Sequence, residues 1–318
     1  MKYQNVLITG AAGRLGRFVY KHLEEQGYTI TLFDQITPAQ ADPAWDDECN
    51  ALFIKGSLND LGDCMRAIQH AQADVIIHLA ALPNDSDKTP RSIQNPRRRI
   101  QTIPEDTTIK SNVMGTYYLL DAARRLNVKK IIFASSFFTL GSGFRISSKP
   151  FQVDYLPLDE KHESRPEDTY SLSKVIGEEM LKAYARSYDI KCVSLRFLGV
   201  SFPFRQFQQV SIEQIKKEQA QKIAEKNSEF AIPQYVDARD IAVVCGLAIE
   251  KDLDSEFEAF FIATDSTCYD ATQAEIVAVL RPDLAEMAKK SIPDGEFVIS
   301  CKKLQDTYNW KPQYANKK

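Results

Sequence analysis

The sequence predicts an α/β protein built on a doubly wound parallel sheet, with a smaller region towards its C-terminal end. The first observation is an apolar run of strand length, Asn5–Thr9, that leads through a glycine turn into an amphipathic helical pattern. The second is the alternation of strand and helix patterns over the first half of the chain. The third is the segment 74–79, which is apolar along nearly its whole length, as in a strand buried on both faces. Alternation with short links predicts parallel strands and right-handed crossovers.

The other expected elements follow in chain order. The first helix runs to about Gln26, and a second strand, 28–33, ends in Asp34. Further strands are expected at 51–55, 74–79 and 130–135, and helices at 61–70, 109–126 and 170–188. A looser stretch, 35–50, interrupts the pattern. Residues 1–200 would form the sheet domain, with 235–250 returning to it, and 201–318 would form most of the smaller region.

Composition and charge are those of an ordinary soluble globular protein. Hydrophobic residues make up 44% and charged residues 26% of the 318 positions. The net charge of -3 gives no electrostatic reason to expect nucleic acid or an anionic membrane surface as a partner. No apolar run approaches membrane-spanning length and the chain enters a strand at once, so we expect a cytoplasmic protein without a signal peptide. The six cysteines and four histidines are scattered, which predicts reduced, mostly buried thiols and no metal site.

The turn after the first strand carries Gly10, Gly13 and Gly16 in the spacing Gly-x-x-Gly-x-x-Gly. A glycine fits a tight turn out of a strand, and a bare backbone lets a phosphate approach the unpaired N–H groups that begin the next helix. We therefore expect the three glycines, together with Arg14 and Leu15, to bind a phosphate. A glycine turn with no ligand is the alternative.

Asp34 ends the second strand, where dinucleotide-binding folds place the acid that binds the adenosine ribose. A carboxylate there accepts hydrogen bonds from the ribose diol of NAD and repels the 2′-phosphate of NADP. Arg14 is a competing signal, because a cation in the glycine turn could meet that phosphate, although it could also point into solvent. We favour NAD over NADP.

Tyr170 and Lys174 open the helix expected at 170–188. Residues i and i+4 share one face of a helix, so the phenol and the ammonium project side by side. Free tyrosine, with a pKa of about 10, is a poor base at neutral pH, and an adjacent cation favours the phenolate. Beside a dinucleotide-binding turn the pair predicts an acid/base catalyst, and a surface Tyr–Lys pair is the alternative.

With these features the chain resembles the extended branch of the short-chain dehydrogenase/reductase superfamily, the NAD-dependent epimerase/dehydratase family. The resemblance covers roughly residues 2–247 and rests on the order and spacing of several motifs. They are Thr9-Gly10-Ala11-Ala12-Gly13-Arg14-Leu15-Gly16, His78-Leu79-Ala80-Ala81, Asn112-Val113-Met114-Gly115-Thr116, Phe133-Ala134-Ser135-Ser136, Tyr170-Ser171-Leu172-Ser173-Lys174, Leu195-Arg196-Phe197 and Tyr235-Val236-Asp237-Ala238-Arg239-Asp240-Ile241-Ala242. It implies a Rossmann-type fold, NAD as cofactor and a small-molecule substrate.

The resemblance also assigns roles to residues. Tyr170 would exchange a proton with the substrate, Lys174 would hold the nicotinamide ribose, and Ser136, or else Ser135, would hydrogen-bond the substrate oxygen. The cofactor would also contact Ser57, Leu58, Leu79, Ala80, Ala81, Asn112 and Tyr170 itself. Ser57 stands where the family usually has an acid. His78 is expected to be a buried strand residue rather than a catalytic one. For Ser136 the alternative is a hydroxyl that caps the end of the strand. For Asn112 the alternative is a side chain that forms its hydrogen bonds within its own helix.

Departures from the family pattern bear on the substrate. Gly199 stands where relatives that act on nucleotide sugars usually carry an asparagine, and a polar helical stretch, 211–226, replaces a Gly-rich turn. The loop 82–108 is longer than usual and carries Arg97, Arg98 and Arg99. One of these could hold an anionic group, but we favour a solvated basic loop.

Two expectations concern the surface of the domain. The segment from Leu304 to Tyr314, with Trp310 within it, should dock on the body, and 315–318 should fray. The helix at 109–126 is apolar on more than one side, so one side should cover the sheet and the other a partner. We expect a homodimer, and coverage by the chain's own insertions is the alternative.

Together these features predict an NAD-dependent oxidoreductase that acts on a secondary alcohol or ketone of a carbohydrate-like metabolite. The alternative enzyme is a nucleotide-sugar epimerase or dehydratase that recycles its NAD. A non-catalytic NAD(P)-sensing regulator is the alternative of another class, and the complete set of Ser136, Tyr170 and Lys174 argues against it.

Overall fold

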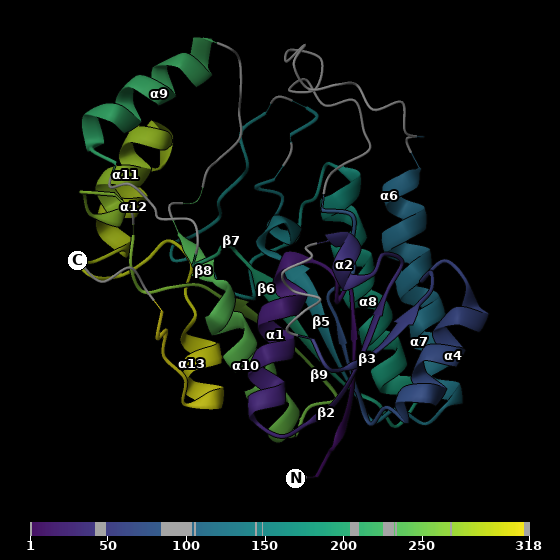
Figure 1. The fold of residues 1–318 in the computed structure, drawn as a ribbon. Coiled ribbons are helices and arrows are strands. Elements are labelled where there is room, and N and C mark those ends of the chain that lie inside the picture. The colour runs from purple at the N-terminus through teal and green to yellow at the C-terminus, as the bar shows by residue number, and fades with distance from the viewer. Residues whose placement is uncertain are drawn as a thin grey trace.

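A seven-stranded parallel sheet in the order β3-β2-β1-β4-β5-β6-β9 forms the centre of the computed structural model (Figure 1). The structure describes residues 2–41, 49–83, 104, 106–143, 145–147, 149–203, 210–224, 232, 234–267 and 269–314. The strands of the sheet are β1 (Asn5–Thr9), β2 (Thr29–Asp34), β3 (Leu52–Lys55), β4 (Val75–His78), β5 (Lys130–Ser136), β6 (Lys191–Phe197) and β9 (Phe257–Ile262). A separate parallel pair consists of β7 (Gly199–Ser201) and β8 (Tyr235–Asp237). The predicted doubly wound α/β fold is confirmed.

Helices cover both faces of this sheet. The helical elements of the first part are α1 (Arg14–Glu25), α2 (Pro38–Ala41), α4 (Leu61–Ala71), α6 (Thr107–Ile109), the π-helical segment η1 (Lys110–Met114), α7 (Gly115–Arg125), the 3-10 turn η2 (Phe137–Leu140) and α8 (Thr169–Ser187). Those of the second part are α9 (Ile212–Ala224), α10 (Ala238–Glu250), α11 (Gln273–Leu280), the 3-10 turn η3 (Pro282–Leu284), α12 (Ala285–Ser291) and α13 (Lys302–Tyr308). In Figure 1, α9, α11 and α12 stand beyond the carboxyl ends of the strands, together with β7 and β8.

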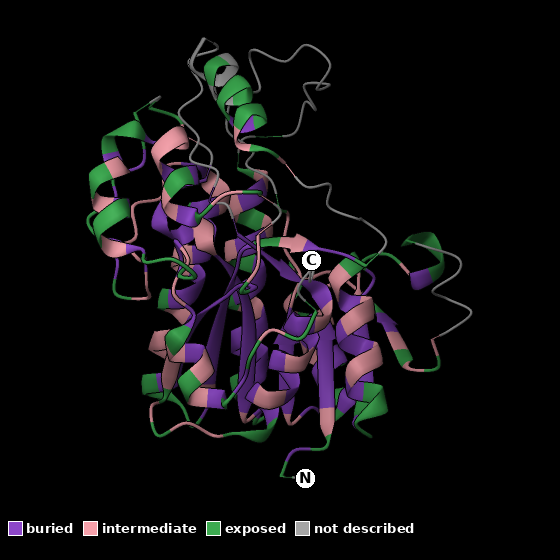
Figure 2. Ribbon diagram, turned by 90° about the vertical axis from the view of Figure 1, so that its left-hand side faces the viewer, coloured by how far each residue is buried: buried purple, intermediate pink, exposed green. Residues whose placement is uncertain are grey.

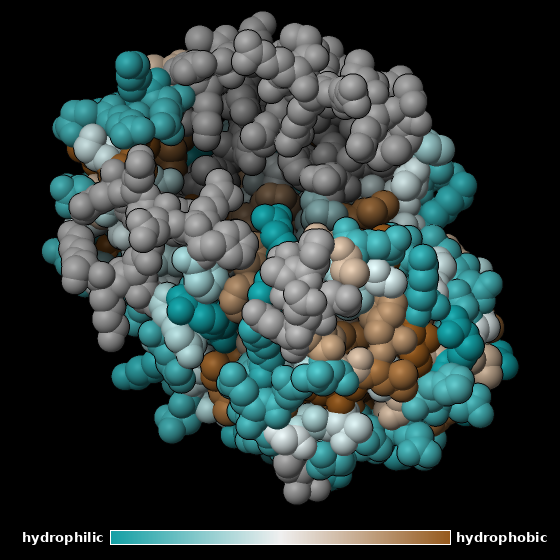
Figure 3. Space-filling view, in the orientation of Figure 1, coloured by the Kyte–Doolittle hydropathy of each residue, from teal (hydrophilic) through white to brown (hydrophobic). Residues whose placement is uncertain are grey.

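Two hydrophobic cores lie on opposite faces of the sheet. One joins the sheet to α1, α10 and α13, and the other joins it to α4, α7 and α8. A third core, which includes Leu158, Val277 and Ile299, holds the smaller C-terminal region together. Figure 2 shows the strands buried between helices whose outer sides are exposed. On the face seen in Figure 3, an apolar area lies at the edge strand β3, where Leu52 is 54% exposed.

The helix expected at 109–126 begins earlier and is not α-helical throughout. It starts at Thr107 and passes through the π-helical segment η1 before α7 begins. Within this wider turn the Thr116 hydroxyl donates to the Asn112 carbonyl oxygen at 2.6 Å. Hydrogen bonds of Asn112 and Thr116 to groups far away in the sequence accompany the π-helical segment, and helical periodicity does not reveal them.

The C-terminal segment docks on the body as predicted. Trp310 is only 3% exposed and lies in the core with Leu304 and Tyr308. The backbone N–H groups of Gln313 and Tyr314 donate to the carboxylate of Asp240 at the start of α10, at 2.8 and 3.2 Å. Residues 315–318 lie outside the described residues.

Three further predictions concern membrane-spanning helices, the cysteines and the basic loop. In the described part of the chain, no helix has the length and apolar character needed to cross a bilayer. Cys64, Cys192, Cys245 and Cys301 are buried free thiols and Cys49 is half-buried, as predicted. Cys268 and the arginines at 97–99 lie outside the described residues.

Candidate active site

The glycine turn is shaped by close contacts with its neighbours. Gly10 has a φ of +70°, and a Cβ added there would lie 2.5 Å from the amide nitrogen of Ala80 at the end of β4. A Cβ at Gly16 would lie 2.3 Å from the carbonyl oxygen of Ala11. These two positions therefore require glycine, because the turn lies against β4 and α1 lies against the turn. Gly13 precedes α1 and forms no side-chain cap, so the helix begins with free backbone donors.

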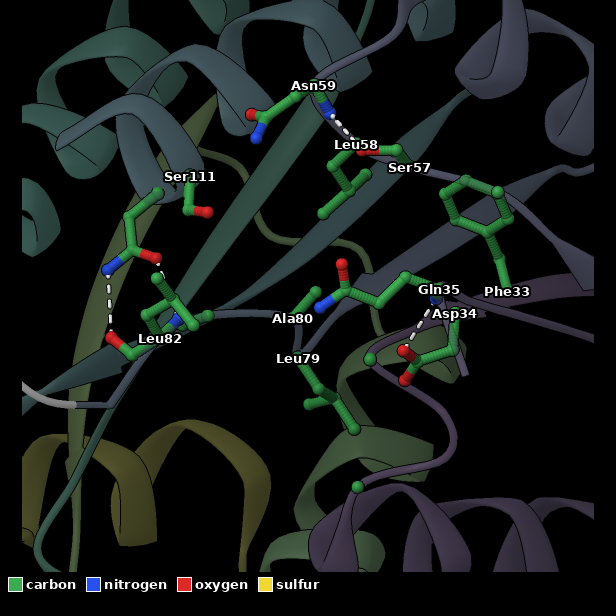
Figure 4. Close-up of a pocket in the computed structure, with 15 residues that line it drawn as sticks. Phe33, Asp34, Gln35, Ser57, Leu58, Asn59, Leu79, Ala80, Leu82 and Ser111 are labelled. Carbon is green, nitrogen blue, oxygen red and sulfur yellow. Dashed lines mark hydrogen bonds between the residues drawn. The ribbon is translucent and has the colours of Figure 1, made fainter. Parts of the chain in front are cut away.

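A pocket opens beside this turn, at the carboxyl ends of β1, β2, β3 and β4 (Figure 4). It measures about 760 Å³ including the space at its mouth that is open to solvent. Nine of the predicted cofactor residues line it: Gly10, Gly13, Asp34, Ser57, Leu58, Leu79, Ala80, Ala81 and Asn112. Six lining residues were not predicted: Phe33, Gln35, Gly56, Asn59, Leu82 and Ser111. Most of these residues are sequence neighbours of predicted ones at the ends of strands. Including every residue near a predicted strand end would therefore have identified them.

Asp34 lies at the edge of the pocket with its carboxylate held in one orientation. The backbone N–H groups of Ala12 and Gln35 donate to its two oxygens, at 3.0 and 2.7 Å. Burial raises the pKa of Asp34, and these backbone hydrogen bonds oppose the rise. The guanidinium of Arg14 lies 5.0 Å from the ring centre of Phe202. Among the described residues, Arg14 and Asp34 form no ion pair.

Tyr170 and Ser136 meet beyond the carboxyl end of β5. The Tyr170 phenol and the Ser136 hydroxyl share a hydrogen bond, which lowers the pKa of the phenol, while burial, the larger effect, raises that pKa to about 12. The Ser136 oxygen also accepts the Phe138 backbone N–H at 3.2 Å. The Phe138 ring stands edge-on to the Tyr170 ring, with 6.1 Å between centres.

Lys174 lies one helical turn beyond Tyr170 and is only 3% exposed. Its Nζ donates to the Ala134 carbonyl oxygen at 2.7 Å and lies 5.7 Å from the centre of the Tyr170 ring. Burial lowers the pKa of Lys174 to about 7, and the charge of Glu178 opposes this shift. The spacing-based prediction that the phenol and the amine share one face of a helix is confirmed.

The sequence analysis missed a buried network behind this pair. Glu178, one turn beyond Lys174, accepts hydrogen bonds from Ser135, Ser194 and Arg196 at 2.7 to 2.9 Å. Ser135 is therefore committed to Glu178, whereas Ser136 meets Tyr170. The recurrence of polar residues at 170, 174 and 178 was the available signal.

Asn112 links the pocket to α8. Its side chain donates to the Leu82 carbonyl oxygen at 3.1 Å, accepts the Leu82 N–H at 2.8 Å, and donates to the Ser173 hydroxyl at 3.0 Å. Ser173 in turn donates to the Tyr170 carbonyl oxygen at 2.7 Å. The amide thus fixes the loop after β4 against the first turn of α8.

His78 has no free ring nitrogen. Its Nδ1 is 2.7 Å from the Thr9 hydroxyl and its Nε2 is 3.0 Å from the Thr116 hydroxyl. Because Thr116 donates its own proton to Asn112, we infer that Nε2 carries the imidazole proton. Burial, aided by the charge of Lys174, lowers the pKa of His78 to about 3. The prediction of a buried, hydrogen-bonded strand histidine is confirmed.

A parallel sheet, a glycine turn at its centre, an acid at the next strand end and a Ser–Tyr–Lys cluster together define the dinucleotide-dependent class of Rossmann-type proteins. The model of the NAD dependent epimerase/dehydratase family matches residues 6–263. The chain belongs to this family, whose members are NAD-dependent enzymes. The predicted family membership and the predicted cofactor, NAD, are thereby confirmed.

Individual relatives carry different activities in their names. A putative UDP-glucose 4-epimerase of Methanocaldococcus jannaschii is 32% identical over 195 residues, which cover 61% of this chain and 55% of the relative. A uronate dehydrogenase of Pseudomonas syringae pv. tomato is 29% identical, over 63% of this chain and 61% of the relative. The chain thus spans little more than half the length of these curated relatives.

The fold is shared with solved structures along nearly the whole chain. A short-chain dehydrogenase/reductase superfamily protein from Agrobacterium tumefaciens, solved with bound NAD, superposes with a TM-score of 0.65 at 23% identity. The superposition covers 98% of this chain and 93% of that one.

Proposed function

We propose that the protein is an NAD-dependent oxidoreductase that transfers a hydride at a secondary alcohol or ketone of a carbohydrate-like small molecule. The observation that carries this proposal is the convergence of Ser136, Tyr170 and Lys174 at the end of β5. Asn112 lines the pocket at the glycine turn and hydrogen-bonds to Ser173 on the helix of Tyr170, which supports an acid/base role for Tyr170 beside a bound dinucleotide.

The pocket residues fit NAD. The glycine turn leaves its backbone donors uncovered for a diphosphate, and Asp34 offers a fixed carboxylate to a ribose diol. Ser57 and Leu58 would lie against the adenine, and Leu79, Ala80 and Ala81 would allow close approach past the end of β4. When bound, NAD supplies hydride transfer at C4 of its nicotinamide ring.

Residues of the chain itself would carry out the proton transfer. Ser136 would hold the substrate oxygen while Tyr170 takes or gives the proton at its hydroxyl. A phenol with a pKa of about 12 is a weak base at neutral pH, so the reaction needs positive charge near it. Lys174, buried under the Tyr170 ring, would favour the phenolate whenever its amine is protonated, and it would bind the nicotinamide ribose.

Gly199 favours a substrate other than a nucleotide sugar. This residue starts β7, just past Phe197, which pairs in register with Ser136. No atom of the described residues lies within 4 Å of a Cβ added at Gly199. The site therefore lacks, next to Ser136, the asparagine that family members acting on nucleotide sugars usually carry.

A homodimer is a further part of the proposal. Met114, Tyr117 and Leu172 lie on η1, α7 and α8 and are 39 to 42% exposed. Large apolar side chains gathered on neighbouring helices favour burial against a second copy.

One screen separates the candidate functions. The purified protein is incubated with NAD and a panel of aldoses, aldohexuronates and UDP-sugars, while reduced nicotinamide is followed by absorbance and the sugars by chromatography. Net reduction of NAD with a free sugar or sugar acid is the expected result. Epimerisation of a UDP-sugar without net reduction would establish the alternative enzyme, and binding of NAD with no turnover of any compound would support a regulator.

A further inference from the structure

The strand end of β5, Ala134–Ser136, runs past the end of β4. The pairing between β4 and β5 stops where His78 lies opposite Phe133. On the other side, the pairing between β5 and β6 continues to Ser136. In the sheet formed by the described residues, the strand end is therefore paired with a strand on one side alone, and the contacts on its open side come from side chains.

The helix α8 supplies these contacts. It lies close against β5, since a Cβ added at Gly177 would lie 2.6 Å from the Phe133 ring. Three residues on one face of α8, spaced four apart, each meet one residue of the strand end. The pairs are Ser136 with Tyr170, Ala134 with Lys174 and Ser135 with Glu178. In the second pair the Lys174 amine donates to the Ala134 carbonyl oxygen, and in the third the Ser135 hydroxyl donates to Glu178 Oε1, each at 2.7 Å.

Glu178 is the most firmly held of the three helix residues. Its carboxylate forms a two-pronged pair with the buried guanidinium of Arg196 on β6, in which Nε donates to Oε1 at 2.9 Å and Nη2 donates to Oε2 at 2.7 Å. Such pairs fix the orientation of both groups. The Ser194 hydroxyl, also on β6, donates to the same Oε1 at 2.9 Å. Glu178 thus offers Ser135 an acceptor whose place is set by the neighbouring strand.

Ser135 stands between the two residues that contact the proposed reaction groups. Its neighbour on one side, Ala134, provides the carbonyl oxygen that accepts from Lys174. Its neighbour on the other side, Ser136, shares a hydrogen bond with Tyr170. Because the three residues are joined covalently, a displacement of Ser135 would move both contacts. Reaction rates depend steeply on such positions.

We propose that Glu178 is a positioning residue, which acts through the Ser135 hydroxyl to hold the strand end in register with Tyr170 and Lys174. The inference rests on the proposed function, because the groups that it positions are those assigned to the proton transfer. Glu178 itself takes no part in that transfer.

Two matched serine variants test the proposal in the full-length protein. Ser135→Ala and Ser194→Ala each remove a buried hydroxyl that donates to Glu178 Oε1, but Ser135 alone belongs to the strand end. On the substrate found by the screen, kcat should fall about tenfold in Ser135→Ala and stay within about twofold of the wild type in Ser194→Ala. Both variants should lower the urea midpoint of unfolding to a similar extent, because each loses one buried hydrogen bond.

A second readout needs no turnover. Lysine labelled with ¹³C at Cε gives an NMR signal for Lys174, which is assigned by its loss in Lys174→Met. The spectra are recorded well above the pKa of this amine, about 7, so that its charge does not change. Ser135→Ala should shift the signal more than Ser194→Ala does, because the Ala134 carbonyl moves in the first variant alone. If the protein proved not to be an oxidoreductase, this comparison would still test whether Glu178 holds the strand end.

A paired replacement tests whether the effect passes through Glu178. Glu178→Met combined with Arg196→Met exchanges a buried ion pair for apolar side chains of similar length, which proteins often tolerate. The paired variant should lose at least as much kcat as Ser135→Ala, and adding Ser135→Ala to it should cause no further loss.

Three results would overturn the proposal. The first is an equal kcat in the two serine variants, which would leave Glu178 a role in stability alone. The second is an equal shift of the Lys174 signal in these variants. The third is a further loss of kcat when Ser135→Ala is added to the paired variant, since the effect of Ser135 would then not depend on Glu178.

Discussion

Lys174 shows how the environment of one residue sets its charge. Its pKa falls from an ordinary 10.5 to about 7 because the amine is buried. Between these values the unfolded chain binds a proton that the folded chain does not, so the free energy of unfolding rises with pH across that window. In Lys174→Met this rise should disappear.

Urea unfolding of the wild type and Lys174→Met without NAD, at pH values near either end of that window, measures the effect. The free energy of unfolding of Lys174→Met should exceed that of the wild type at the lower pH. This difference should shrink as pH rises, because the wild type then no longer buries a charge. Lys182→Met, which removes a partly exposed lysine from the same helix, should track the wild type at both pH values. A constant difference between Lys174→Met and the wild type would contradict the buried-charge account.

At the scale of single residues, part of the candidate site was predictable from the sequence. Tyr170 and Lys174 were predictable because their spacing alone places them on one helical face. Glu178 and Arg196 were not, since their pairing depends on α8 crossing β6, and no local pattern contains that contact. Phe202 was not predictable either, because its contact with Arg14 depends on how the smaller region packs against the rest of the chain.

At the scale of elements, Lys130 connects β5 to the end of α10. Its Nζ donates to the carbonyl oxygens of Ala248, Ile249 and Lys251 at 2.9 to 3.1 Å and pairs with Asp252 at 2.7 Å. A buried cation here satisfies carbonyl groups that the helix leaves without partners.

Replacing Lys130 with Met should therefore lower the free energy of unfolding by about 2 to 4 kcal/mol, since the buried carbonyls lose their partner and Asp252 keeps, among the described residues, only Lys2 and Tyr3. Lys129→Met is the matched control, because the neighbouring lysine makes an exposed pair with Asp189. Its effect should stay within about 0.5 kcal/mol. Equal effects of the two variants in urea titrations would show that the contacts of Lys130 contribute little.

Helices and strands were largely predictable because hydrophobic periodicity reports which face of an element is buried. All five strands predicted in the first half are present, with ends shifted by one or two residues at most. The π-helical segment η1 was not predictable, because hydrogen bonds from Asn112 to Leu82 and Ser173 accompany it and are not local.

For the whole molecule, the alternation of strands and helices predicted a parallel sheet. It did not predict that β9, from the last quarter of the chain, completes the edge of that sheet.

The proposed homodimer is also testable at the scale of the whole molecule. Tyr117→Glu places a charge on the exposed side of α7 that would face the second copy and should convert the dimer to a monomer in sedimentation equilibrium, with unchanged NAD affinity. A wild-type protein that sediments as a monomer at micromolar concentration would remove the dimer from the account.

The central claim is that Tyr170 is the acid/base group of an NAD-dependent oxidoreductase. Its most direct test compares Tyr170→Phe with the wild type, on the substrate found by the screen, in turnover and in NAD binding. The account predicts that kcat falls about 10²- to 10⁴-fold while the dissociation constant of NAD stays within about twofold. Turnover by Tyr170→Phe at the wild-type rate would contradict it.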